Sequence, residues 1–380
     1  MSTYTQMRYI AYQVPTVGSG VAGFLEMPSG NATNQLVLDG INKPVITNLS
    51  NPDARQRVAC FYLAMIQAAN AVALLADDRN TLKVFVAPEF YFRPTSADGT
   101  NGPSYSYAQY KEIKAALISL SNDRLFKDWL IIPGTIMWTG TGIIGKRPIT
   151  GDNVYFNTCP YIKVGTFNTQ SHVLEKEQSS HIDGLPTGYH GPPPIGPTAK
   201  ATDEVWTIYQ TRAKKEKHVI EHYGIQCGVE ICLEHGRALL KDILSDLVNW
   251  KTGTITKTRK SISLQILTSG GMTIDSANVT VVNNGYILRN DGLGTNAAGG
   301  IGFPQVEIRK VLSYSNKNFG RGLPVSYGSK PGFAQFDPTP IAVERTVVLT
   351  GQRTVPSPAG NTPAYYFPQS IILYNRVPLP

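Results

Sequence analysis

Three ionisable side chains lie where predicted strands end, in positions that suit covalent chemistry. Glu89 directly follows the apolar run VFVA in the string VFVAPEFYFRP, and Cys232 ends the apolar strand in GIQCGVEICLEHGRALL. Lys176 lies near the end of a predicted hairpin strand, in the string SHVLEK. Folds of the α/β class place their sites just beyond the carboxyl ends of strands. Because Cys232 immediately precedes a predicted helix, we expect a lowered thiol pKa and backbone N–H groups suited to an oxyanion.

Each of these residues also has an ordinary structural explanation. A buried cysteine usually packs in a core, a glutamate after a strand usually lies in a turn, and a lysine on a hairpin is usually solvated. The combination of the three residue types, and their order along the chain, is what favours a functional site.

Strands and helices alternate through most of the chain and would position these side chains. We expect strands at 7–13, 82–87, 129–136, 154–164, 171–177, 223–232, 262–267 and 281–289, and helices at 52–77, 107–121 and 236–250. Asn51 and Pro52 suit the start of the first helix. This alternation predicts an α/β fold in one domain, with sheets covered by helices. Residues 183–204 are rich in proline and glycine and are expected to form an irregular loop.

With these motifs in this order, the sequence resembles the nitrilase superfamily of carbon–nitrogen hydrolases. The resemblance rests on PEFYF around Glu89, on Lys176, and on GVEICLEH around Cys232, where Glu234 fills the family's acidic position. Asn157 precedes Lys176 by one hairpin's length, as a family asparagine precedes the catalytic lysine. The segment 183–222 is longer than usual, and 273–279 is short for the helix expected there.

The resemblance implies a four-layer α-β-β-α sandwich with a Pro/Gly-rich C-terminal extension. The carbon–nitrogen hydrolase domain would span 1–312, with 183–222 as a long loop insertion. Residues 313–380 would be the extension, either part of the same domain or an oligomerisation arm. Family members pair into homodimers or higher homo-oligomers, so self-association is implied here as well.

The resemblance also assigns roles to the three residues. Cys232 would attack an amide, carbamoyl or nitrile carbon and form a thioester. Glu89 would act as general base and acid, and Lys176 would stabilise the oxyanion together with the Cys232 backbone N–H. No metal and no organic cofactor is implied, and the partner is a small-molecule amide or nitrile.

Further pocket residues stay open at this point. Tyr91 and Phe92 follow Glu89 and either line the pocket or pack in the core. Glu234 and His235 follow the nucleophile and are also candidate pocket residues. Family members often carry a second glutamate near the nucleophile, for which this sequence offers Glu175, Glu177 and Glu204.

Composition excludes several classes of protein. The net charge is +8, but the basic residues gather at 212–217 and 251–260, where no aromatic residues alternate with them. We therefore expect solvated surfaces and no nucleic-acid partner. No apolar run is long enough to span a bilayer, so we expect no membrane partner. Four cysteines in 380 residues and no evident secretory signal favour a cytoplasmic protein.

Three other functions compete with this hypothesis. The string HVIEH, from His218 through Glu221 to His222, has the spacing of an inverted zinc-peptidase motif. That chemistry needs a helix, whereas the segment runs into a predicted strand and favours a surface hairpin arm. Cys232 and His235 are too close in sequence for a productive cysteine–histidine protease. The last alternative is a nitrilase-like scaffold that has lost activity and serves binding or assembly.

Overall fold

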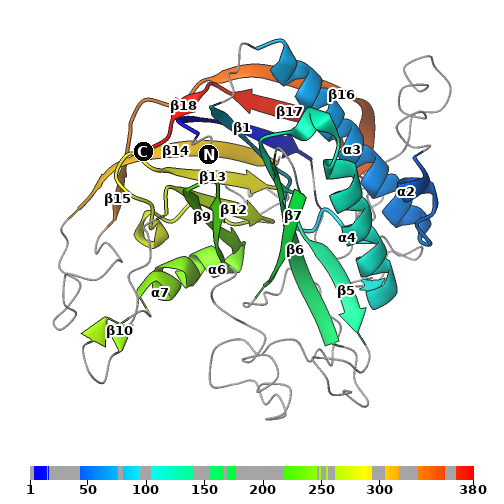
Figure 1. The fold of residues 1–380 in the computed structure, drawn as a ribbon, viewed down its shortest axis with the longest axis horizontal. Coiled ribbons are helices and arrows are strands. Elements are labelled where there is room, and N and C mark those ends of the chain that lie inside the picture. Colours follow the sequence, from blue (N-terminus) through cyan, green and yellow to red (C-terminus); the bar gives the residue numbers. More distant parts are fainter. Residues whose placement is uncertain are drawn as a thin grey trace.

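Two mixed β-sheets pack face to face in the computed structural model (Figure 1). The structure describes residues 4–14, 16, 43–75, 80–94, 104–140, 154–165, 169–176, 218–245, 248–249, 254–255, 262–292, 304–315, 333–355 and 365–380. Helices cover the outer face of the larger sheet, and shorter helices lie beside the smaller one. The chain therefore has the mixed α/β fold that the alternation of elements predicts.

The larger sheet combines strands from both ends of the sequence. Its spatial order is β16 (Val343–Val355), β17 (Tyr365–Tyr374), β1 (Gln6–Gln13), β2 (Thr81–Val86), β4 (Trp129–Ile132), β6 (Val154–Val164), β5 (Ile136–Gly140) and β3 (Tyr105–Ser106). Off this path, β18 (Val377–Pro378) pairs with β1, and β7 (Thr169–Glu175) pairs with β6. The central strands β1, β2 and β4 are parallel, so their carboxyl ends lie at one edge.

The smaller sheet supplies the opposite wall. Its spatial order is β15 (Ala334–Phe336), β14 (Gln305–Tyr314), β13 (Tyr286–Asp291), β12 (Leu264–Ser269), β9 (Ile225–Ile231) and β8 (Val219–His222). The strands β9, β12 and β13 are parallel. On either side of them, β8 is antiparallel to β9 and β14 is antiparallel to β13, while β15 is antiparallel to β14. A separate two-stranded pair is formed by β10 (Val248–Asn249) and β11 (Thr254–Ile255).

The two long helices start where the sequence provides caps. In α3 (Pro52–Ala73) the Asn51 side chain accepts a hydrogen bond from the backbone N–H of Ala54. In α4 (Tyr107–Ser121) Ser106 and Gln109 form a capping box. The shorter elements are α2 (Pro44–Thr47), α6 (Leu233–Gly236), α7 (Leu239–Ser245) and the 3₁₀ turns η1 (Arg124–Phe126) and η4 (Ser276–Asn278).

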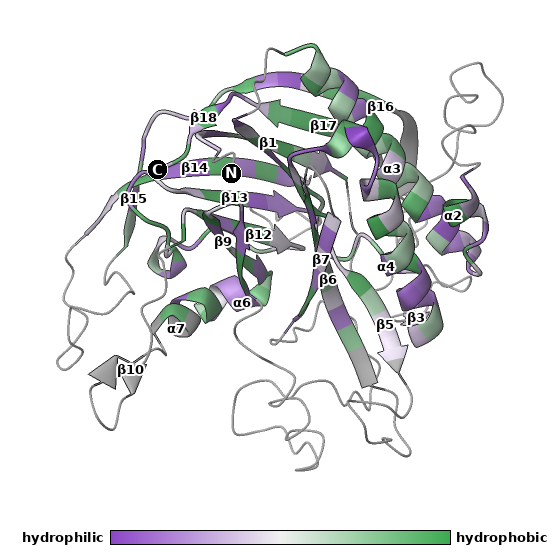
Figure 2. Cartoon of the chain, in the orientation of Figure 1, coloured by the Kyte–Doolittle hydropathy of each residue, from purple (hydrophilic) through white to green (hydrophobic). Residues whose placement is uncertain are grey.

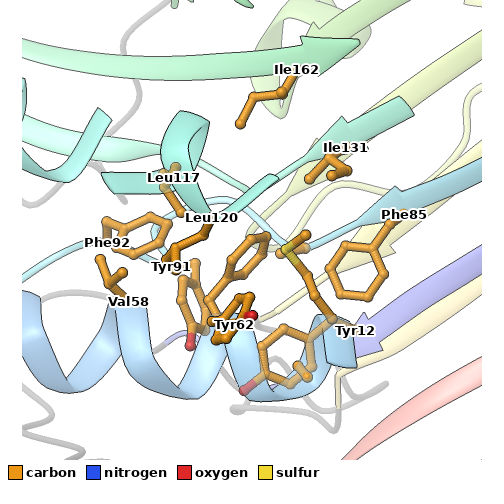
Figure 3. Close-up of a cluster of buried hydrophobic side chains, with 14 of the residues drawn as sticks. Tyr12, Val58, Tyr62, Phe85, Tyr91, Phe92, Leu117, Leu120, Ile131 and Ile162 are labelled. Atoms are coloured by element: carbon orange, nitrogen blue, oxygen red, sulfur yellow. The ribbon is translucent and has the colours of Figure 1, made fainter. Parts of the chain in front are cut away.

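Alternation along the strands divides the apolar residues into separate cores. On β2, Phe85 faces α3 and α4, while its neighbours Val84 and Val86 face the smaller sheet. The core beneath the helices is rich in aromatic residues from both sides, as Figure 3 shows. Around α3 and α4, hydrophobic residues alternate with hydrophilic ones (Figure 2). Burial of these cores is the main stabilising term and fixes the two sheets against each other.

Several predicted elements differ from the observed ones at their ends. The expected strand 129–136 is broken by Pro133 and Gly134 into β4 and β5. The expected helix 236–250 is shorter: it consists of α6 and α7, and residues 248–249 form β10 instead. The strand expected from 223 begins at Ile225 after a turn, and the strand expected from 281 begins at Tyr286. In the last two cases a residue with positive φ, Tyr223 or Asn284, makes the turn that precedes the strand.

The segment 183–204, expected to be a loop, lies outside the described residues. In 273–279, expected to be too short for a regular helix, the structure has the 3₁₀ turn η4. Among the described helices, none is long and apolar enough to cross a membrane.

Candidate active site

Glu89 lies in a tight turn just beyond the end of β2. Ala87 still donates a backbone hydrogen bond to Ile132, after which the chain turns away from the sheet. Phe90 has a φ of 62°, and its N–H donates to the Thr135 hydroxyl at 2.8 Å. A positive φ in a non-glycine residue costs about 1–3 kcal/mol, so the surrounding structure must hold this turn in place. The Glu89 side chain is fully buried.

The hairpin β6–β7 brings two nitrogen donors to Glu89. Asn157 and Lys176 lie opposite each other, because the Lys176 N–H donates to the Asn157 carbonyl at 2.8 Å. Both side chains reach the same carboxylate oxygen: Asn157 Nδ2 and Lys176 Nζ each lie 2.8 Å from Glu89 Oε1. The Lys176–Glu89 ion pair is almost completely buried, at 1% and 0% side-chain exposure. Removing either partner would leave a buried charge uncompensated.

Cys232 lies at a sharp turn between β9 and α6. Alternation along β9 would put residue 232 on the outer face with Glu230, yet Cys232 packs in the core between the sheets. The change of direction occurs at Cys232 itself, whose φ is 50° and ψ is −108°. Its N–H donates to the Thr268 carbonyl at 2.9 Å, which fixes the turn to β12. The expectation that this N–H stabilises an oxyanion is therefore wrong, because the group is already bonded.

The thiol points toward Glu89 and the end of β12. Cys232 Sγ lies 3.9 Å from the Gly270 carbonyl. Burial raises the pKa of the thiol well above its usual value, and the charge of Glu89 and a hydrogen bond with Glu89 raise it further. Lys176 and a backbone hydrogen bond with Gly270 act in the opposite direction but do not offset these causes. The expected lowering of the thiol pKa is thus wrong: α6 has four residues, and burial beside a carboxylate outweighs its N-terminus.

Phe90 and Gly270 shape the space beside the ion pair. The Phe90 ring lies 5.5 Å from Lys176 Nζ and 5.4 Å from the guanidinium carbon of Arg93, measured to the ring centroid. A Cβ added to Gly270 would lie 3.1 Å from this ring and 3.6 Å from Glu89 Oε2. The small residue after β12 therefore lets the aromatic ring and the carboxylate lie close to Cys232.

The other aromatic residues after Glu89 pack in the core. Tyr91 and Phe92 belong to the cluster beneath α3 and α4 (Figure 3). Both rings lie beside that of Phe61, with centroids 5.8 and 6.0 Å away. The Tyr91 hydroxyl donates to the Arg57 carbonyl at 3.1 Å. The sequence left open whether Tyr91 and Phe92 line the pocket or pack in the core, and these contacts match core packing.

Glu234 and His235, which follow Cys232 in α6, are fully buried. Glu234 Oε2 accepts the Ile231 N–H at 2.7 Å, and His235 Nδ1 lies 2.8 Å from Glu230 Oε2. Both contacts reach back to β9, to residues that precede Cys232. Of the candidates for a second glutamate, Glu175 is half-buried on β7, while Glu177 and Glu204 lie outside the described residues.

Sequence reasoning missed Phe90 and Gly270 and used Asn157 only to measure hairpin length. No pattern in the string PEFYF distinguishes the aromatic residue at the site from the two in the core. The role of Asn157 had a detectable signal, since a hairpin register that pairs 157 with 176 puts both side chains on one face.

Polar side chains join the two sheets at the same edge. The Thr268 hydroxyl donates to the Ala87 carbonyl at 2.9 Å. Asn290 Nδ2 lies 2.6 Å from the Val86 carbonyl and 3.0 Å from that of Tyr12. Because these bonds connect the carboxyl ends of strands in different sheets, they fix the distance between Glu89 and Cys232.

The HVIEH segment does not form the helix that a zinc peptidase needs. Its last four residues are β8, and it forms the hairpin arm expected from the sequence, although His218 and His222 are buried. Four residues of strand separate them by about 13 Å, too far for one metal ion. His218 Nδ1 lies 2.9 Å from the Val229 carbonyl. Within the described part of the chain, no group of three His, Cys, Asp or Glu side chains is arranged to hold a metal.

Comparisons with known proteins give structural likeness at low sequence identity. No family model matches the sequence, and a search of curated proteins found no match. Among solved structures, the chain is similar to a mutant of the Nesterenkonia AN1 amidase of the nitrilase superfamily, with 11% identity and a TM-score of 0.36. That match covers 97% of this chain and 90% of the other.

Two further structures of an amidase from Nesterenkonia give similar values. One is a mutant in complex with butyramide, with 12% identity, a TM-score of 0.36, and coverage of 87% of this chain and 90% of the other. The second has 13% identity, a TM-score of 0.35, and coverage of 88% and 91%.

Proposed function

We propose that this protein hydrolyses a non-peptide carbon–nitrogen bond of a small amide through a cysteine thioester. The observation that carries the proposal is the Glu89 carboxylate, which is bonded to Lys176 and Asn157 and also raises the pKa of the Cys232 thiol. A buried carboxylate beside a neutral thiol and an ammonium group combines a base, a nucleophile and a positive charge in one place.

In the first half-reaction Glu89 removes the thiol proton as Cys232 Sγ attacks the carbonyl carbon. The raised pKa of the thiol means that the thiolate forms during attack, and Glu89 is close enough to accept the proton. The new S–C bond pushes the carbonyl electron pair onto oxygen, where Lys176 provides the opposing charge. Glu89 then gives the proton to the nitrogen, the C–N bond breaks, and ammonia or an amine leaves a thioester.

In the second half-reaction water replaces the leaving nitrogen. Glu89 is again a carboxylate and accepts a proton from the water as its oxygen attacks the thioester carbon. The tetrahedral intermediate collapses with breakage of the C–S bond, and the proton on Glu89 returns to the sulfur. The products are the carboxylic acid and the free enzyme.

Lys176 suits both of its roles because an ammonium group carries three N–H donors. One donor holds Glu89 Oε1, and another can meet the oxyanion as it forms. Asn157 bonds the same oxygen and keeps the carboxylate oriented when Lys176 shifts its interaction toward the substrate. No step of this scheme requires a metal or an organic cofactor.

Ammonia release across a panel of small amides, carbamoyl compounds and nitriles tests the proposal. We expect release by the wild type and loss of release in Cys232→Ala. Cys227→Ala is the matched control, since Cys227 is a buried thiol on the same strand whose side chain packs between the sheets. Turnover that survives Cys232→Ala would refute the proposal. Absence of turnover in the wild type on every compound would favour the inactive scaffold.

A further inference from the structure

A second buried carboxylate lies behind the nucleophile and has no part in the scheme above. Glu230 is on the outer face of β9, two residues before Cys232, and is fully buried. Its Oε1 accepts the Leu240 N–H at 3.0 Å, where α7 begins. Its Oε2 lies 2.8 Å from Gln265 Nε2 on β12 and 2.8 Å from His235 Nδ1. Glu230 therefore joins β9, β12 and the two helices that follow the nucleophile.

The contacts of His235 define its tautomer. The Asp275 N–H donates to His235 Nε2 at 2.9 Å, so this nitrogen is an acceptor and carries no proton. Nδ1 therefore carries the proton and donates it to Glu230 Oε2. Burial by itself raises the pKa of Glu230, but His235 and the other donors lower it by more, and the net direction is downward. Glu230 is thus an ionised acceptor that suits each of its donors.

The Glu230–His235 pair closes the turn that holds Cys232. His235 follows Cys232 by three residues, and its N–H donates to the Cys232 carbonyl at 3.0 Å. Glu234 makes a parallel connection from α6 back to the N–H of Ile231. A helix of four residues such as α6 is not stable by itself, so side-chain contacts must fix it.

We propose that Glu230 and His235 are positioning residues that hold Cys232 in its positive-φ conformation and so direct the thiol at Glu89. This inference rests on the proposed function and deepens it. The sequence alone makes His235 a candidate for the substrate pocket. Its bonds to Glu230 and Asp275 instead direct both ring nitrogens into the structure behind the turn.

Alkylation of Cys232 by iodoacetamide as a function of pH, followed by peptide mass spectrometry, tests the pair without requiring turnover. For the wild type we expect the midpoint of alkylation to lie at higher pH than for an ordinary thiol, because burial and Glu89 raise the pKa of Cys232. We expect Glu230→Gln and His235→Ala to release the turn, move the thiol away from Glu89, and shift the midpoint to lower pH. On an amide substrate, kcat falls by about 100-fold and KM stays within about threefold.

Conservative variants separate positioning from general loss of structure. His235→Asn puts an amide nitrogen where Nδ1 lies and should keep the wild-type midpoint. His235→Gln places its amide at the position of Nε2, loses the bond to Glu230, and should shift the midpoint. Ser121→Ala is the stability control, because it removes a buried 2.7 Å bond to Leu117 on distant α4. If Glu230→Gln does not fold, the comparison of His235→Asn with His235→Gln still tests whether the bond between His235 and Glu230 positions Cys232.

The inference is overturned if folded Glu230→Gln and His235→Gln keep the wild-type value of kcat and the wild-type midpoint of Cys232 alkylation. This result can be told apart from failure of the proposed function. In that failure Cys232→Ala keeps the activity, or the wild type has none, whereas the alkylation profiles still report how the turn is held.

Discussion

The Glu89 carboxylate interacts with three side chains, and these interactions determine the charges at the candidate site. Asn157 and Lys176 bond one oxygen of its carboxylate, and the thiol of Cys232 interacts with the same side chain. Because the carboxylate and the thiol are both buried, their mutual effect is larger than it would be in water. The thiol stays protonated near neutral pH, and its activation depends on Glu89.

The pH dependence of Cys232 alkylation provides the first prediction. Glu89 disfavours the thiolate through its charge, so Glu89→Gln removes one cause of the raised pKa. We expect the alkylation midpoint to move to lower pH while hydrolysis is lost, because the variant has no base. Glu112→Gln on α4, whose carboxylate accepts hydrogen bonds from Ser50, is the matched control and should change neither property. A midpoint that moves to higher pH would contradict this description of the thiol.

At the scale of single elements, the turn after β2 determines where Glu89 lies. Gly134, with a φ of 80°, passes so close to this turn that an added Cβ would lie 2.2 Å from the Pro88 carbonyl oxygen. A side chain at position 134 would push the backbone of Pro88 away, and the displacement would reach Glu89, the next residue in the chain.

Two glycine substitutions test this close approach. Gly134→Ala adds both left-handed strain and an overlap, so we expect a loss of about 3 kcal/mol or more in unfolding free energy. Gly224→Ala is the control: its φ is 86°, but nothing lies within 4 Å of the added Cβ. It should cost about 1–2 kcal/mol. Urea denaturation measures both, and equal losses would show that the contact with Pro88 has no effect.

The sequence predicted most elements, and it failed where tertiary contacts decide the backbone. The caps of α3 and α4 are local signals, and both helices begin where the sequence indicated. The positive-φ conformations of Phe90 and Cys232 have no local signal, because neither residue type favours a positive φ. They are held by Thr135 and Thr268, which are distant in sequence. The lowered thiol pKa was predicted from a helix start, but burial beside Glu89 was not visible in the sequence.

For the whole molecule, the arrangement of the sheets places the site between them. Glu89 comes from the larger sheet and Cys232 from the smaller one, so the proposed reaction would depend on their relative position. The residues near the C-terminus contribute to this frame, since β17 pairs with β1 and packs beneath the helices. We propose that the described residues of the predicted extension, 313–315, 333–355 and 365–380, belong to the same domain as the site.

Asn290 tests how strongly the sheets are held together at this edge. Asn290→Leu removes the hydrogen bonds to the carbonyls of Val86 and Tyr12, so each of these buried carbonyls loses a donor. We expect a loss of about 1–3 kcal/mol in unfolding free energy. Activity should fall as well, because the distance between Glu89 and Cys232 is less well fixed. Asn48→Leu, at an exposed position after α2, is the control and should change stability by no more than about 0.5 kcal/mol.

Intact-mass spectrometry of the protein, quenched during turnover of a small amide, shows whether Cys232 forms a thioester. We expect an adduct with the mass of the acyl group, located at Cys232 by peptide mapping and absent from Cys232→Ala. Cys159 is the internal control: it is also buried, and the charge of Glu89 acts on it as well, yet it should stay unmodified. Turnover with no adduct at Cys232 under any quench, or an adduct at Cys159, would contradict a thioester mechanism at Cys232.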